Sequence, residues 1–510
     1  MTSPSKKLFY EDRPLRVLFI VDSMYWVVSN LFHQINKDNP MVDAQLCSQF
    51  AIRKTIKRFG SFSPTLDVVH FLRKKPIKIF KGKHPIVSTL HHVDSGTELA
   101  HLYESDAVMT MSTQWNNYLI DKGISSHKLG IVPFGVDAKI FHPPNAEERL
   151  LTRRSLNLPN EAFVIGFSGR RTSDTDGRKG IRCFVEALRS ANQQLRSVAT
   201  VIIGPGWQDL AHELQMEGIT CSLIPYHIDH EKIANFYHAM DVFWVTAKIE
   251  GGPVPLLEDM ASGIPCISTP VGAALDLIND HKNGFIVPFD SPNQLADLSN
   301  YLAKNNDLRK QIGMEARNTI LQERSWSQSQ QKMQDLYERA TKNFEQESTQ
   351  RRQSEKTNSD STVSSKMRVG ELDFFSPTLQ KWIAACEHLN GLRMVLEMGE
   401  WKAATRIGVR ALKTATFDFY VWLEFFKILI KQTKKYSLTH DMEGANNTKD
   451  LRIGVPGLHQ GRHLIVIGLI QGKLRVIWDE CSFCSQGKEP TKLPDLALST
   501  IPFGWTANLN

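Results

Sequence analysis

The sequence predicts an α/β protein of two Rossmann-like, doubly wound domains that face each other across a cleft, followed by an α+β extension. Three observations carry this prediction. Short apolar runs alternate with helical patterns, the alternation occurs in two successive series, and a chain of 510 residues exceeds the roughly 250 to 300 residues of a single core. We therefore expect one domain at residues 1–142 and a second at residues 143–324.

The strands of both series are short apolar runs. The first run, Leu15–Val21, is apolar except for Arg16, as expected of a parallel strand covered on both faces. Because ligands bind outside the carboxyl ends of such strands, we expect functional residues directly after them. The other predicted strands are Asp67–Phe71, Pro85–Leu90, Ala107–Met111 and Gly130–Pro133 in the first series, and Phe163–Ser168, Ala199–Gly204, Cys221–Ile224, Val242–Val245, Pro265–Ser268 and Gly284–Val287 in the second.

Three segments follow the second domain. Residues 325–342 are predicted to form a closing helix, and residues 343–370 are so rich in polar side chains that we expect a disordered linker. Residues 371–510 form the extension, for which the sequence indicates no family. Its predicted elements are helices at Leu379–Leu389, Leu392–Leu412 and Phe417–Ile430, and a β-hairpin of His463–Ile470 and Lys473–Trp478.

Composition predicts a cytoplasmic protein. The first twelve residues are polar and mixed in charge, unlike a secretory signal, and no apolar run approaches the ~18 residues of a membrane span. Seven cysteines, an odd number in a large chain, indicate a reducing compartment. Cys481 and Cys484 form one pair, short of the four ligands of a structural zinc site.

A net charge of +7 is distributed unevenly. The segment between Leu46 and His84 has a single acid, Asp67, and two interpretations of its basic residues remain open: a solvated surface, or a surface for an anionic membrane or a phosphate-bearing acceptor. Nucleic acid is disfavoured because no nucleic-acid module accompanies the charges. The basic block consists of Arg53, Lys54, Lys57, Arg58, Arg73, Lys74, Lys75, Lys78, Lys81 and Lys83.

The segment from Glu250 to Gly272 gives the strongest functional signal. Glu250 lies in a glycine loop, and Glu258 follows eight positions later on the opening turn of a short helix that Pro255 begins and Gly263 ends. Backbone N–H groups at the start of that helix can receive a diphosphate. The two carboxylates can accept hydrogen bonds from hydroxyl groups, so the segment predicts a sugar-nucleotide site.

With this spacing the chain resembles the retaining glycosyltransferases of the family 4 type, the glycosyl transferases of group 1, whose signature is Glu, seven residues, Glu. The resemblance runs in order from about residue 14 to 341. It implies the GT-B fold, in which the first domain binds the acceptor and the second binds the donor. The other matching segments are Ile131–Asp137, Phe141–Pro143, Phe163–Gly180, Asn283–Pro288 and Trp326–Tyr337.

The resemblance implies a donor-phosphate site without a metal ion or other cofactor. Arg170 and Lys179 occupy the positions at which the family has its diphosphate-binding cations. Fixed positive charge there stabilises a leaving diphosphate. A longer insertion than usual follows Arg170, so that either Arg170 or Arg171 faces the phosphate.

The same resemblance assigns roles to the glutamate segment. Glu250 would hold the donor sugar near its reacting carbon, and Glu258 would bind the ribose hydroxyls. Gly251 and Gly252 would let the backbone approach the sugar and the phosphate. We expect Asp259, in contrast, to face solvent.

Two sequence features concern the acceptor side of the site. His91 follows the strand ending at Leu90 and resembles a histidine that points into the cleft of the family, with His92 as the alternative. The chain lacks the family's glycine-rich loop after the first strand, and Asp22, Tyr25 and Trp26 stand there instead. Aromatic rings of this kind can stack on an acceptor sugar or pack between domains.

Two functions follow from these residues. The first is a retaining glycosyltransferase that moves a sugar from a nucleotide-diphosphate sugar to a glycan, lipid-linked or protein acceptor, in the cytoplasm or at the inner membrane face. The alternative is a catalytically weak glycan- or nucleotide-binding module with an interaction tail. The joint presence of Arg170, Lys179, Glu250 and Glu258 favours the enzyme.

Overall fold

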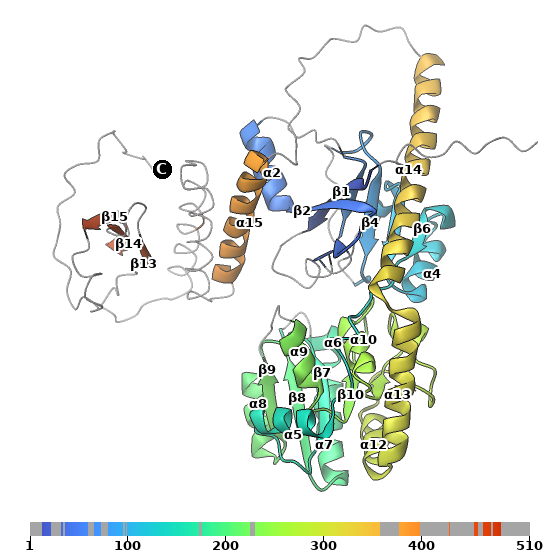
Figure 1. Cartoon of the computed structure of the whole chain (residues 1–510), viewed down its shortest axis with the longest axis vertical. Helices are drawn as coiled ribbons and strands as arrows, with labels where there is room; N and C mark the ends of the chain where they lie inside the picture. Colours follow the sequence, from blue (N-terminus) through green and yellow to red (C-terminus); the bar gives the residue numbers. More distant parts are fainter. Residues whose placement is uncertain are drawn as a thin grey trace, which may run out of the picture. The chain divides into compact units, whose positions relative to one another are not determined.

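The computed structural model divides the chain into two compact units (Figure 1). The first comprises Met1–Gln49 and Phe62–Glu371, and the second comprises Phe50–Ser61 and Leu372–Asn510. The structure describes residues 13–21, 32–33, 36–59, 66–72, 80–94, 97, 99–172, 176–224, 230–357, 377–397, 428, 453–456, 463–470 and 473–480.

The first sheet of unit one has six parallel strands in the order β2-β1-β3-β4-β5-β6. All five strands predicted for the first series are confirmed. The additional strand β2 was missed because it is an edge strand, mostly half-buried, in which Asp43 and Gln45 interrupt the apolar pattern. The strands are β1 (Leu15–Val21), β2 (Val42–Ser48), β3 (Val68–Phe71), β4 (Ile86–Leu90), β5 (Ala107–Thr110) and β6 (Leu129–Ile131).

The second sheet also has six parallel strands, in the order β12-β11-β10-β7-β8-β9. All six predicted strands are confirmed. The four inner strands are apolar runs buried on both faces of the parallel sheet, whereas the edge strand β9 is partly buried. The six strands are β7 (Phe163–Ser168), β8 (Val198–Ile203), β9 (Thr220–Ile224), β10 (Val242–Val245), β11 (Cys266–Ser268) and β12 (Phe285–Ile286).

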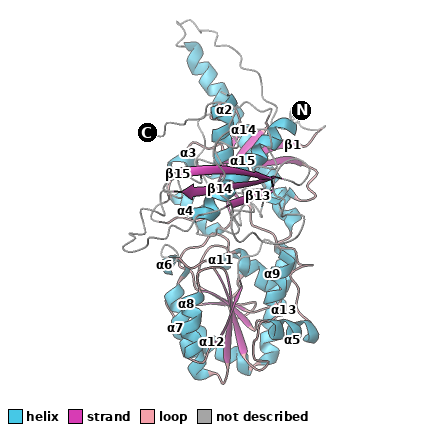
Figure 2. Ribbon diagram, turned by 90° about the vertical axis from the view of Figure 1, so that its left-hand side faces the viewer, coloured by secondary structure: helices cyan, strands magenta, loops and turns pink. Residues whose placement is uncertain are grey.

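Helices cover both faces of the second sheet, with α7 and α8 on one side and α9 and α13 on the other (Figure 2). This layering produces the doubly wound fold that the sequence predicts. The helices of this half are α5 (Ala146–Ser155), α6 (Asp176–Lys179), α7 (Ile181–Gln194), α8 (Gln208–Met216), α9 (His230–Tyr237), α10 (Val254–Ala261), α11 (Ala274–Leu277), α12 (Pro292–Lys304) and α13 (Asn306–Glu323). The first half of unit one contains α3 (Ala100–Tyr103), α4 (Thr113–Asp121) and the short helix η1 (Ser126–Lys128).

Helix α14 (Trp326–Thr357) returns to the first sheet and packs beside β4, β5 and β6 (Figure 1). The Tyr337 hydroxyl lies 3.0 Å from Nδ1 of the buried His70, and Asn343 Nδ2 donates to the Asp106 carbonyl at 2.8 Å. The prediction of a disordered linker from residue 343 is wrong for residues 343–357, which continue the helix. Gln, Glu, Lys and Arg are good helix formers, so a polar segment can remain helical. Residues 358–370 lie outside the described residues.

Unit two contains α2 (Gln49–Phe59), α15 (Pro377–Glu397) and an antiparallel sheet of β13 (Ile453–Pro456), β14 (His463–Ile470) and β15 (Lys473–Glu480). The predicted hairpin is confirmed. The predicted break between Leu389 and Leu392 is wrong, because α15 continues through the fully buried Asn390. The Trp382 indole donates to Thr55 Oγ1 at 3.1 Å, which joins α15 to α2. Apart from Ile428, the third predicted helix lies outside the described residues.

The basic block includes residues with partners and residues without an acidic neighbour. The Arg58 guanidinium lies over the Trp382 ring at 4.3 Å, and Lys81 pairs with Glu104 at 2.8 Å. Arg53 and Lys57 are exposed on α2. The four cations Arg73, Lys74, Lys75 and Lys78 lie outside the described residues. Over the described part of the chain, every helix is too short or too polar to cross a membrane.

Candidate active site

The candidate active site lies where the order of the second sheet reverses. β7 and β10 are neighbours in space, yet the chain leaves them in opposite directions along the sheet. The loops after these two strands therefore separate and leave a crevice at their carboxyl ends. The loop after β7 contains Arg170 and leads to Lys179, and the loop after β10 contains Glu250.

Backbone contacts hold these two loops together. Thr246 Oγ1 donates to the Lys179 carbonyl at 2.9 Å, and the Lys248 N–H donates to the Arg178 carbonyl at 2.8 Å. Gly180 has a φ of +63°, and a Cβ there would lie 1.9 Å from the Thr246 carbonyl oxygen. Only glycine fits this position, because it combines a left-handed conformation with a close backbone approach.

Glu250 meets two cations from the other loop. Lys179 Nζ lies 2.5 Å and Arg178 Nη1 lies 3.1 Å from Glu250 Oε1. Burial alone would raise the pKa of Glu250, but Lys179 and Arg178 outweigh burial and lower the pKa below its usual value. Glu250 is therefore an ionised carboxylate inside a nearly buried cluster.

The two candidate phosphate-binding arginines lie in different surroundings. Arg171 Nη1 is 3.2 Å from Asp209 Oδ2 at the start of α8, so its side chain is directed to that helix. Arg170 lies at the end of β7, next to Gly169, whose carbonyl accepts from the Trp207 indole at 2.8 Å. The Arg171 guanidinium is therefore already paired with Asp209 in the structure.

Glu258 lies on α10 and is 6% exposed. The Tyr237 hydroxyl donates to Glu258 Oε2 at 2.7 Å. Burial raises the pKa of Glu258 to about 7, although the hydrogen bond from Tyr237 acts in the opposite direction. The two glutamates of the motif therefore differ in pKa: Lys179 and Arg178 lower the pKa of Glu250, whereas burial raises the pKa of Glu258.

The expectation that Asp259 faces solvent is wrong, since its side chain is fully buried. Helix α10 has six consecutive buried residues, from Leu256 to Ala261, and so it has no solvent side at this point. Burial raises the pKa of Asp259 well above its usual value, while hydrogen bonds from the Met260 N–H and the Cys266 thiol oppose the rise only in part. Burial therefore favours the neutral form of the Asp259 carboxyl group.

The first half of unit one reaches the glutamate loop through the segment after β4. A Cβ on Gly251 would lie 1.7 Å from the His91 carbonyl oxygen, so Gly251 is required for contact with the first half. His91 Nε2 lies 2.6 Å from the Leu72 carbonyl. His92, which sequence reasoning kept as the alternative to His91, adds a smaller electrostatic effect to those of Lys179 and Arg178 in lowering the pKa of Glu250.

Helix α4 provides three more contacts across the two halves of unit one. The buried Trp115 Nε1 donates to the Glu250 carbonyl at 2.7 Å, and Gln114 Oε1 accepts from the Gly272 N–H at 2.5 Å. The Thr113 N–H at the start of α4 donates to Asp276 Oδ2 at 3.0 Å. The first turn of α4 therefore fixes the backbone on both sides of the glutamate loop.

Comparison with known proteins relates this geometry to one family. Residues 148–319, which include both loops, match the family described as glycosyl transferases group 1. We refer to residues 148–319 as the group 1 domain after this match. The candidate residues Arg170, Lys179, Glu250 and Glu258 all lie inside this group 1 domain.

Two relatives and one solved structure extend the comparison. A D-inositol 3-phosphate glycosyltransferase of Xylanimonas cellulosilytica is 27% identical over 230 residues, 43% of this chain and 53% of the relative. A GDP-mannose-dependent alpha-mannosyltransferase of Corynebacterium glutamicum is 30% identical over 153 residues, 30% of this chain and 34% of the relative. This chain thus spans about half the length, or less, of these curated relatives.

The solved structure is that of Anabaena HepE in complex with UDP and glucose. It is 15% identical, with a TM-score of 0.51 over 63% of this chain and 98% of HepE. The group 1 domain and the sheet that precedes it therefore have the GT-B fold of two Rossmann-like halves.

Sequence reasoning did not assign two residues that contact Glu250, namely Arg178 and Trp115. Arg178 stands next to Lys179, so its adjacency to a predicted site residue was a usable signal. Trp115 gave no local signal, because it lies on a different domain from the group 1 domain. Asp22, Tyr25 and Trp26 lie outside the described residues.

Proposed function

We propose that this protein is a retaining glycosyltransferase that moves a sugar from a nucleotide-diphosphate sugar to a glycan, lipid-linked or protein acceptor. The observation that carries the proposal is the cluster of Lys179, Arg178 and Glu250 at the switch point of the group 1 domain. Cations there suit a diphosphate, and the adjacent carboxylate suits sugar hydroxyls.

The leaving diphosphate is stabilised by fixed positive charge. In this proposal Lys179 and Arg170 provide that charge, and the unpaired backbone N–H groups at the start of α10 add to it. Charge built into the protein does not need to reorganise as the bond to the sugar breaks. This arrangement supports a reaction that requires no metal ion, with the nucleotide sugar as co-substrate.

The donor diphosphate and Glu250 compete for the same cations. With no donor bound, Lys179 and Arg178 neutralise Glu250. When the diphosphate recruits Lys179, Glu250 loses part of its neutralisation and becomes a stronger acceptor for hydroxyl groups of the donor sugar, next to its reacting carbon. Glu258, on the following helix, accepts from the ribose hydroxyls.

The acceptor lies on the side of the first domain, where His91 and His92 border the glutamate loop. We also propose a cytoplasmic location with peripheral contact to an anionic membrane, because Arg53 and Lys57 are exposed on α2. Attraction of this kind is screened over a Debye length of about 8 Å at physiological salt. Binding to anionic vesicles should therefore fall steeply with added salt and with Arg53→Ser and Lys57→Ser.

The test of the main proposal is release of nucleotide from UDP-glucose and GDP-mannose by the full chain, with and without a chelator. These donors follow from the UDP complex of HepE and the GDP-mannose dependence of the Corynebacterium relative. Lys179→Ala and Arg170→Ala should each abolish most release. Two controls should have little effect: Arg171→Ala, which removes the partner of Asp209, and Arg182→Ala, on the exposed side of α7.

Three outcomes separate the possibilities. Release that survives the chelator supports the metal-independent enzyme. Release that disappears with chelator and returns with a divalent ion contradicts the proposed role of Lys179 and Arg170. Tight binding of either donor without release would favour the alternative of a nucleotide-binding module.

A further inference from the structure

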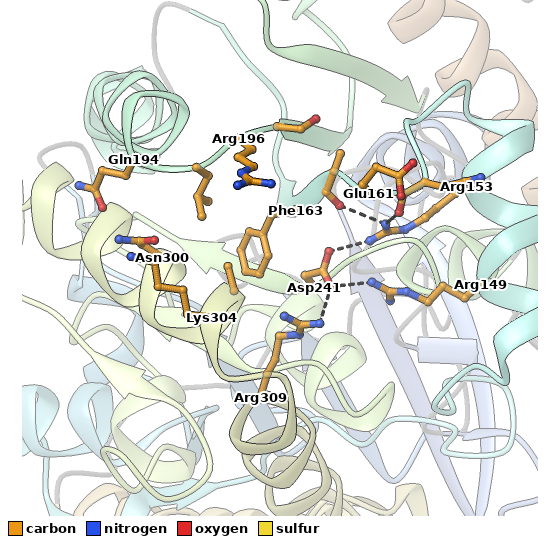
Figure 3. A pocket seen from close by; sticks show the side chains of 15 residues that line it. Arg149, Arg153, Glu161, Phe163, Gln194, Arg196, Asp241, Asn300, Lys304 and Arg309 are labelled. Carbon is orange, nitrogen blue, oxygen red and sulfur yellow. Dashed lines mark hydrogen bonds and ion pairs between the residues drawn. The ribbon is translucent and has the colours of Figure 1, made fainter.

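A pocket lies at the opposite end of the second sheet from the candidate active site (Figure 3). Its lining includes Phe163, Ser197 and Asp241, which stand at the amino ends of β7, β8 and β10. The candidate active site follows the carboxyl ends of β7 and β10, so no residue is shared between the two. The pocket has a volume of about 610 Å³, within the range of about 300 to 1,000 Å³ that small-molecule sites occupy.

The deep wall of the pocket contains three guanidinium groups around one carboxylate. Arg149 and Arg153 each lie 2.6 Å from Asp241, and Arg309 lies 3.2 Å from it. A single negative charge therefore faces three positive charges in a half-buried place. Burial and the neighbouring arginines lower the pKa of Arg153 and Arg309, consistent with this surplus of positive charge.

The outer wall adds cations that have no acidic partner. Arg196 and Lys304 are exposed, and neither makes a hydrogen bond or an ion pair with another described residue. Asn300 Oδ1 is buried and, among the described residues, also lacks a hydrogen-bond partner. Figure 3 shows these side chains across Phe163 from the Asp241 cluster.

The lining as a whole has five cationic side chains and two acidic ones, Asp241 and Glu161. The Asp241 carboxylate is already paired with three arginines, so the surplus positive charge of the lining is available to an anion. Arginine and lysine bind phosphate oxygens through charge-assisted hydrogen bonds, which are about twice as strong as neutral ones. An unpartnered amide oxygen accepts a hydrogen bond, so it suits a hydroxyl of the same ligand.

We propose that this pocket binds a small phosphate-bearing anion such as a sugar phosphate. Arg196, Lys304 and Arg309 contact the phosphate group, and Asn300 accepts from a hydroxyl group of the ligand. The site is separate from the donor site, and the proposal does not depend on transferase activity.

The test is calorimetric titration of glucose 1-phosphate and of inorganic phosphate into the full chain. Both ligands could also enter the donor site, so the titrations use protein with an unaltered donor site that is saturated with UDP. Arg196→Ser with Lys304→Ser should weaken glucose 1-phosphate binding at least tenfold and leave UDP binding unchanged. Asn300→Asp, which adds a negative charge, should weaken it as well.

The matched control removes the same charge elsewhere. Lys282→Ser with Lys332→Ser replaces two exposed lysines that do not line the pocket, and it should leave glucose 1-phosphate binding unchanged. Tighter binding of glucose 1-phosphate than of inorganic phosphate supports the role of Asn300. Absence of binding in the UDP-saturated chain, or equal losses in the two double variants, would overturn the proposal.

Discussion

Replacement of Gly251 by alanine should remove most of the proposed transferase activity through a backbone collision. A Cβ at this position would lie 1.7 Å from the His91 carbonyl oxygen, and Cβ contacts below 3.0 Å essentially do not occur in proteins. The two backbones must therefore separate by the difference, about 1.3 Å. The colliding atom is a main-chain oxygen, so a rotation of a side chain cannot relieve the contact.

The glutamate loop has little freedom to move away from His91. The Ala273 N–H donates to the Gly251 carbonyl at 3.1 Å, and a Cβ on Gly272 would lie 2.2 Å from that same oxygen. Most of the displacement therefore reaches Glu250, the adjacent residue. A misplacement of about 1 Å at a reacting centre can cost about 100-fold in rate, or about 2.7 kcal/mol of transition-state stabilisation.

The assay is the rate of nucleotide release from the donor, measured beside UDP affinity and thermal unfolding. Gly251→Ala should lose about 100-fold in turnover. Gly252→Ala should lose less, since its nearest neighbour would be Met111 Cβ at 3.3 Å, and Gly177→Ala should be tolerated because nothing lies within 4 Å. A Gly251→Ala protein that turns over like the Gly177→Ala control would refute the argument that this contact positions Glu250.

Three further predictions concern charge and chain length. Glu258→Ala should weaken UDP binding by about 1.5 to 3 kcal/mol. Glu250→Ala should instead tighten UDP binding, because it releases Lys179 and Arg178, and should lower turnover. Equal losses of UDP affinity in calorimetry would contradict this division of roles. Because the pKa of Asp259 is raised by burial, its contribution to stability is full below the unfolded pKa of about 3.9 and declines as pH rises. Asp259→Asn should therefore become more stable relative to wild type in denaturant titrations from pH 5 to pH 8, and a constant difference would contradict a neutral Asp259. A chain ending at Thr357 should bind UDP. A chain ending at Asn343 should be less stable, because it loses the ion pair of Lys128 with Glu347. If the chain ending at Thr357 does not bind UDP, the residues after Thr357 belong to the donor-binding core.

The sequence alone determined the strands and the chemistry of the glutamate segment. β1, β7 and β10 begin and end at the predicted residues, because a strand buried on both faces is recorded locally as an apolar run between turn residues. The hairpin of β14 and β15 was equally local. The glutamate spacing and its glycines were sufficient to indicate a donor site on the second domain, which the group 1 match supports.

Only the tertiary structure decided which side chains meet. Glu250 contacts Arg178 and Trp115, which are 72 and 135 residues away in the chain. Such contacts depend on the strand order and on how the two halves of unit one pack, and neither leaves a periodic pattern in the sequence. The burial of Asp259 and the grouping of α2 with α15 have the same origin. A polar residue such as Asp259 is exposed or buried according to what packs against its helix. The segments that pack against that helix are distant in the chain.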